Sequence, residues 1–117
     1  MKKLDSIFAW ILLLLGCIHC AAAFVAYKSV TLEAVWFITG GLAMIFGALL
    51  NMVRIARPGD RLPTGLSMLA NILLFAVFVI VVPWVLRHEL KQNPQVFAVG
   101  LAVIVEFVFS LKFFLSK

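Results

Sequence analysis

Two cysteines and a histidine lie within four residues of one another, in the stretch Cys17-Ile18-His19-Cys20. Thiolates and imidazoles bind zinc, but structural zinc sites use four ligands that usually come from two separated pairs. The sequence has only one further histidine, His88, and it lies far along the chain. A c-type haem attachment site has its histidine after the second cysteine, unlike this order. We therefore expect no metal or cofactor here and interpret both thiols as small apolar packing residues.

Two ionisable residues lie inside long apolar stretches, His19 in the first and Glu106 in the last. Such side chains are unfavourable in hydrocarbon and usually face the protein interior. On a helix, His19 shares a face with Ala23, and Glu106 shares one with Ala102 and Ser110. Small residues are typical of close contacts between membrane helices. Since both lie near the middle of their stretches, we predict that His19 and Glu106 form a hydrogen-bonded or ionic pair near the membrane midplane.

Amide, hydroxyl and carboxyl side chains complete an inward-facing polar set. The second apolar stretch begins near Glu33 and ends near Asn51, and the third has Ser67 and Asn71 one turn apart. We interpret the amides and hydroxyls, including Ser110, as interhelical hydrogen-bonding groups worth about 0.6 kcal/mol each. Glu33 is expected at the outer mouth of the bundle. The candidate ligand-binding or proton-binding residues are Glu106, His19, Glu33, Asn71 and Asn51.

Composition predicts the helices on which these residues lie. The chain has 117 residues, of which 65% are hydrophobic and 13% charged, which is too apolar for a soluble domain. Four apolar stretches each have roughly the 20 residues that a helix needs to cross about 30 Å of hydrocarbon. Strands of membrane barrels are shorter and alternate in hydropathy. The sequence therefore predicts one all-α polytopic membrane domain over residues 1–117. We expect an up-down-up-down four-helix transmembrane bundle with spans at 7–27, 32–53, 64–86 and 95–115.

Lysine and arginine are unevenly distributed between the two ends of these spans. One end has Lys2, Lys3, Arg54, Arg57, Arg61, Lys112 and Lys117, and the other has Lys28, Arg87 and Lys91. Because positive residues favour the cytoplasmic side, both termini are predicted there. A cytoplasmic basic loop containing Arg54, Arg57 and Arg61 is predicted on the same side. The basic residues are not interleaved with aromatics on a polar face, so no nucleic-acid partner is expected.

Several residues predict where the helices begin and end. Thr31 has the side chain of a helix N-cap, and Asn93 followed by Pro94 predicts a cap with proline at the first helical position. Pro83 is expected to kink or end the third span. The tryptophans lie toward span ends, as is typical of residues at the membrane interface: Trp10, Trp36 and Trp84.

The first apolar stretch also contains sequences that resemble processing sites. Leu14-Leu15-Gly16-Cys17 is similar to a lipoprotein cleavage box, and Ala21-Ala22-Ala23 to a signal-peptidase site. Both alternatives require a polar, exportable segment immediately downstream. The chain instead stays apolar and reaches the next span after a few polar residues. We therefore expect a retained first span.

The spacing of one motif resembles that of uncharacterised small bacterial four-span membrane proteins. The motif comprises His19, Thr31-x-Glu33-x-x-Trp36-Phe37-x-x-Gly40-Gly41-Leu42, and then Gly47 and Asn51. The resemblance covers mainly the first half of the chain and implies a bacterial inner-membrane protein without implying an activity. Small multidrug-resistance transporters have a similar size and span count, but their key glutamate lies in the first span. In this chain the mid-span carboxylate is Glu106 in the fourth.

Three classes of function are compatible with this pattern. The first is a structural or accessory subunit of the inner membrane, in contact with the lipid bilayer and with a second copy or another membrane protein. The alternative is a proton-linked transporter or ligand-binding module that uses Glu106, in an oligomer. The third is an intramembrane enzyme or haem protein that uses His19. Because no set of nucleophile, base and orienting group is evident, we do not expect an enzyme.

Overall fold

The computed structural model describes residues 1–116, which fold as helices joined by short turns without any β-strand in that range. The helices are α1 (Lys2–Ala26), α2 (Leu32–Ala56), α3 (Arg61–Phe75), α4 (Val82–Val85) and α5 (Gln95–Leu115). A π-helix, η1 (Ala76–Val81), joins α3 to α4, and a 3₁₀ helix, η2 (Leu90–Gln92), precedes α5. Four segments are long and apolar enough to cross a membrane: α1, α2, the continuous helical segment Arg61–Val85, and α5. We refer to these segments, in chain order, as the first to fourth rods. The prediction of an all-α chain with four apolar helices is confirmed.

The helices extend beyond the predicted spans mainly at one end of the molecule. α1 begins at Lys2 rather than residue 7, α2 continues to Ala56 rather than residue 53, and α3 begins at Arg61 rather than residue 64. These added turns include Asp5 and Arg54, which the sequence placed outside the spans. The difference matters because both side chains are buried there.

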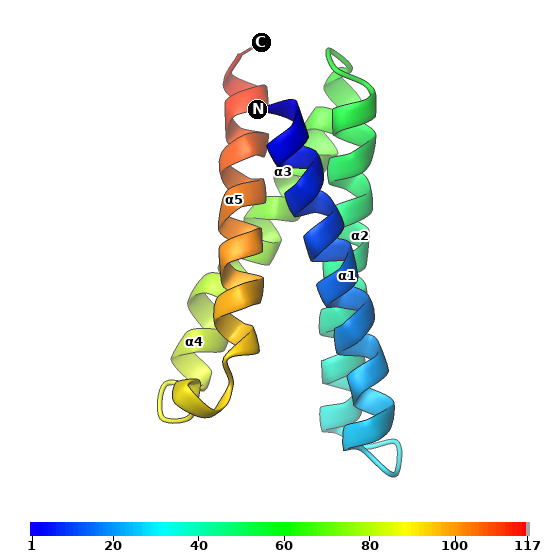
Figure 1. Cartoon of the computed structure of the whole chain (residues 1–117), viewed down its shortest axis with the longest axis vertical. Helices are drawn as coiled ribbons and strands as arrows, with labels where there is room; N and C mark the ends of the chain where they lie inside the picture. The colour runs from blue at the N-terminus through cyan, green and yellow to red at the C-terminus, as the bar shows by residue number, and fades with distance from the viewer. Residues whose placement is uncertain (117) are drawn as a thin grey trace.

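The start of α1, the end of α5 and the turn between α2 and α3 lie at one end of the molecule, which we refer to as the termini end (Figure 1). The turns at 27–31 and 86–94 lie at the other, the distal end. α1 packs chiefly on α2, and α3 packs chiefly on α5, while α2–α3 and α1–α5 contacts join the two pairs. The pairs converge at the termini end and diverge toward the distal end (Figure 1).

An apolar core joins the helix pairs near the middle of the bundle. It is built from small, branched and long side chains of every rod: Leu12, Met44, Ala48, Leu74, Phe78, Val99, Ala102 and Val103. α1 and α2 approach each other closely at two glycines. A Cβ atom added to Gly16 would lie 2.9 Å from the Gly41 carbonyl oxygen, and one added to Gly41 would lie 2.9 Å from the Gly16 carbonyl oxygen. Only residues without a side chain permit this backbone contact.

Of the two predicted helix caps, Thr31 is confirmed and Asn93 is wrong. The Thr31 hydroxyl accepts a hydrogen bond from the Ala34 amide at 3.2 Å and caps α2. Asn93 does not cap α5, which begins at Gln95 with Pro94 in the N-cap position. The Asn93 Oδ1 atom instead accepts a hydrogen bond from the Gln95 side-chain Nε2 at 3.0 Å, and Asn93 Nδ2 donates to the Glu89 carbonyl oxygen at 3.0 Å. The helix start agrees with the predicted span 95–115, and only the cap lies one residue later than predicted, at Pro94 instead of Asn93.

The third rod passes through Pro83 and ends two residues later, at Val85. Because proline has no N–H, it removes one helical hydrogen bond and crowds the preceding turn. The six residues of η1 directly before α4 are π-helical, which is the wider winding seen where a regular hydrogen-bond ladder is interrupted. All three tryptophans are exposed, at Trp10, Trp36 and Trp84.

Candidate functional site

Three charged side chains from three helices meet near the termini end and form what we term the charged cluster: Asp5, Arg54 and Glu106. Asp5 lies near the start of α1 and Arg54 in the last turn of α2, which the fold brings to the same end of the molecule (Figure 1). Glu106 lies beyond the middle of α5. All three side chains are at most 1% exposed. The cluster is therefore an internal feature of the bundle.

The Arg54 guanidinium is the centre of the charged cluster. Its Nη1 and Nη2 atoms donate to the two carboxylate oxygens of Asp5 at 3.0 and 2.7 Å, a bidentate ion pair. Nη2 also donates to Glu106 Oε2 at 3.3 Å, and Nε donates to Ser67 Oγ at 3.0 Å. The Phe113 ring centroid lies 5.0 Å from Cζ. These contacts tie α2 to each of the other three rods.

Glu106 is the incompletely paired member of the charged cluster. Its Oε2 atom accepts the longest of the Arg54 hydrogen bonds, whereas Oε1 is buried without a hydrogen-bond partner. Buried polar atoms are almost always satisfied, so an orphan oxygen on an ionisable group requires an explanation. Glu106 is thus the place in the cluster where a proton or ligand could be held.

An amide–hydroxyl network continues from the charged cluster toward the core and consists of Asn51, Ser67, Asn71 and Ser110. The Asn51 Oδ1 atom accepts from Ser67 Oγ at 2.6 Å and from Asn71 Nδ2 at 2.7 Å, and its own amide group donates to Asn71 Oδ1 at 3.2 Å. Ser110 Oγ lies 3.0 Å from Ser67 Oγ and also accepts from Asn71. The predicted hydrogen bonding between helices is confirmed for these four residues.

The predicted pair of His19 and Glu106 does not form. The His19 ring stacks on Phe37 of α2, with centroids 3.7 Å apart and planes 14° apart, while Glu106 bonds Arg54. Asp5 and His19 are separated by fourteen residues of α1, a rise of about 21 Å. The prediction is wrong because α1 begins five residues earlier than expected, which moves His19 from mid-span toward the distal end.

The prediction that Arg54 belongs to a basic loop together with Arg57 and Arg61 is wrong. Arg54 is in the last turn of α2 with its side chain buried in the bundle, whereas Arg57 and Arg61 are exposed at the turn between α2 and α3. Sequence reasoning missed Asp5 as a site residue and assigned Arg54 to the basic loop instead of the interior. The signal was present in the helical spacing, since Arg54 follows Asn51 by three residues and Asp5 precedes Ala9 by four, on the buried faces of their helices.

The remaining candidates lie away from the charged cluster. Glu33 is exposed in the first turn of α2 at the distal end. Cys17 is an exposed free thiol, and the half-buried Cys20 thiol donates a hydrogen bond to the Ile38 carbonyl oxygen at 3.6 Å. Within residues 1–116, no three His, Cys, Asp or Glu side chains gather into a group that could hold a metal ion.

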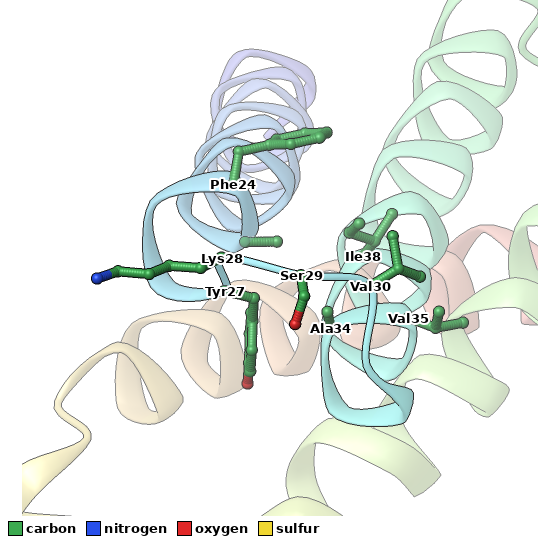
Figure 2. Close-up of a pocket in the computed structure, with 9 residues that line it drawn as sticks. Phe24, Tyr27, Lys28, Ser29, Val30, Ala34, Val35 and Ile38 are labelled. Atoms are coloured by element: carbon green, nitrogen blue, oxygen red, sulfur yellow. The ribbon is translucent and has the colours of Figure 1, made fainter.

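Two shallow apolar pockets lie toward the distal end. One, of about 220 Å³, lies beside the turn between α1 and α2 and includes Phe24, Tyr27 and Ile38 (Figure 2). The other, of about 260 Å³, lies between the third rod and α5 and includes Phe78 and Phe97. Neither pocket is lined by a residue of the charged cluster or of the amide–hydroxyl network. The polar interior and these pockets are separate features.

We compared the chain with protein-family models, with curated proteins and with solved structures, and none of them matches it.

Proposed function

We propose that this chain is a multi-pass protein of the bacterial inner membrane, an up-down-up-down four-helix bundle that acts as a structural or accessory subunit. The observation that carries the proposal is the burial of the charged cluster and the amide–hydroxyl network, whose side chains are at most 1% exposed. Polar groups that bond one another across helices and are closed to solvent stabilise the bundle and present no surface to a ligand. The proposed role is therefore to provide a stable membrane surface for a partner.

The exposed surface supports a role in contact with lipid and protein. Large apolar side chains cover the outside of each rod, among them Phe24, Phe46, Leu69 and Phe97. In a membrane this surface faces acyl chains or the apolar surface of another protein, either a second copy or a different chain. The basic residues at the termini end are suited to an anionic lipid surface, where each gains about 1 kcal/mol.

The proposed orientation follows from the exposed positive charges. Lys2, Lys3, Arg57, Arg61 and Lys112 are exposed at the termini end, and Lys28, Arg87 and Lys91 at the distal end. Although Arg54 is buried, the excess of positive charge at the termini end remains. We infer that both termini and the α2–α3 turn are cytoplasmic.

Single-cysteine labelling in intact cells tests this orientation, after both native cysteines are replaced by alanine. Lys28→Cys and His88→Cys should react with a membrane-impermeant maleimide. Lys3→Cys and Arg57→Cys should react only after the cells are permeabilised. Labelling of Lys3→Cys and Lys28→Cys from the same side would contradict the four-span topology, and the reverse pattern would contradict the orientation.

Cross-linking in native membranes tests the accessory role. We expect a membrane partner, either a second copy or another protein, to be recovered at fixed stoichiometry. The same partner should be recovered with the Glu106→Gln variant, which alters only the interior, and with the matched surface control Glu33→Gln. Recovery of the chain without a stoichiometric partner would contradict the proposal.

A proton-linked binding module or transporter is the second candidate, and the orphan Oε1 atom of Glu106 favours it. Equilibrium binding of tetraphenylphosphonium, a lipophilic cation, distinguishes the two functions. The module should bind this probe saturably, with an affinity that depends on pH and is lost in Glu106→Gln but kept in Glu33→Gln. The accessory role predicts no such pH-dependent binding.

A further inference from the structure

The charges of the charged cluster do not balance when every group is ionised. It contains two carboxyl groups, on Asp5 and Glu106, and one guanidinium, which stays protonated in proteins. With both carboxylates ionised, the cluster has a net charge of minus one while completely buried. An uncompensated charge inside a membrane bundle is strongly unfavourable.

Within residues 1–116, Arg54 is the only cation in an ion pair with Asp5 or Glu106, and the lysines of α1, Lys2 and Lys3, are exposed. α3 presents Ser67, a neutral hydroxyl, and its one ionisable residue, Arg61, is exposed. On α5 the nearest lysine in sequence is Lys112, which is exposed and whose Nζ lies 3.0 Å from the Met1 sulfur. The charged groups that face Glu106 are thus Asp5 from α1 and Arg54 from α2.

The two carboxyl groups are paired very unequally. Asp5 accepts two hydrogen bonds from Arg54, one on each oxygen, at 3.0 and 2.7 Å. Glu106 accepts one, at 3.3 Å, and its Oε1 atom is buried without a donor. A carboxylate oxygen can only accept, so an ionised Glu106 would leave desolvated charge on Oε1. A protonated carboxyl group has no such charge.

We propose that Glu106 binds one proton in the folded protein, so that the charged cluster is a neutral, buried proton-binding site. The proton adds to a Glu106 carboxylate oxygen and is taken from water. Asp5 and Arg54 remain an ion pair, and the second carboxyl group becomes neutral. Since Asp5 and Glu106 both bond the same Arg54 nitrogen, the two carboxyl groups lie close enough for one proton to change the charge felt by both. This proposal does not rest on the accessory role.

The bound proton links the stability of the bundle to pH. In the unfolded chain Glu106 is exposed to water and ionised at neutral pH. The folded state then binds one more proton than the unfolded state, so the free energy of unfolding falls as pH rises. Deprotonation would leave a negative charge between α1, α2 and α5 and would weaken their contact at the termini end.

Infrared spectroscopy of the wild-type protein in lipid tests the proton and its location. We expect the carbonyl band of a protonated carboxyl group at neutral pH, shifted in heavy water and lost at alkaline pH. Carboxyl-¹³C glutamate, introduced by cell-free synthesis, should shift the band, whereas carboxyl-¹³C aspartate should not. Glu106→Gln, which has the shape of the neutral acid, should fold and lack the band, and Glu33→Gln, an exposed control, should keep it.

Three results would overturn the proposal. The first is the absence of the band from the folded wild type at neutral pH. The second is a band that shifts with labelled aspartate, which would place the proton on Asp5. The third is loss of the band on adding sodium ions, with a matching gain in stability, which would make the site one for a metal cation. None of these outcomes alters the cross-linking result that tests the accessory role.

Discussion

Replacing Arg54 with alanine is expected to lower the free energy of unfolding by about 3–5 kcal/mol, the usual effect of removing one partner from a buried ion pair. The substitution leaves both Asp5 oxygens and Glu106 Oε2 without their donor, and Ser67 Oγ without the bond from Nε. The loss is large because two buried carboxyl groups must then be protonated or reached by water. Arg54 is thus expected to be the most sensitive charged residue of the chain.

Unfolding in mixed micelles, followed by circular dichroism, measures this effect. Arg57→Ala is the matched control, since Arg57 is only three residues away and exposed, and its substitution should change stability by no more than about 0.5 kcal/mol. Arg54→Lys should be only a partial rescue, because an ammonium group cannot bond both Asp5 oxygens in the planar geometry of a guanidinium. Equal stabilities for Arg54→Ala and Arg57→Ala would show that the charged cluster does not hold the helices together.

Gly41→Ala is expected to destabilise the protein by about 1–3 kcal/mol, the range for overpacking a close interface. The added methyl group would meet the Cys20 sulfur and would lie 2.9 Å from the Gly16 carbonyl oxygen and 3.0 Å from the Cys20 nitrogen. Two of these atoms belong to the backbone of α1 and cannot rotate away. α1 and α2 must therefore separate, which also strains the other contacts of their interface.

Gly65→Ala is the control for helix propensity, because a Cβ atom at Gly65 would meet nothing within 4 Å. Exchanging an unhindered helical glycine for alanine stabilises helices by up to about 1 kcal/mol, so the two alanine variants should differ in sign. The same micelle unfolding measurement applies. A stabilising Gly41→Ala would contradict the close approach of the two helices.

The sequence alone determined that the chain has four helices long and apolar enough to cross a membrane, because this depends only on apolar length and composition. It also identified Asn51, Ser67, Asn71 and Ser110 as groups that hydrogen-bond between helices. Polar residues on apolar helices have few other partners, so their helical face predicts their role. Thr31 was recognised as a cap for a similarly local reason, since capping depends on a few neighbouring residues.

Which charged side chains meet depends on the packing of the helices and does not follow from the sequence pattern. Asp5 and Arg54 lie next to basic residues at the ends of the predicted spans, where sequence patterns assign them to the membrane surface. Their pairing joins residues far apart in the chain and depends on how far each helix extends and on the angles at which the helices converge. An error of five residues at the start of α1 moves a side chain about 7 Å along the axis. That shift separates His19 from Glu106 and brings Asp5 toward it, while the extension of α2 to Ala56 places Arg54 between the two carboxyl groups.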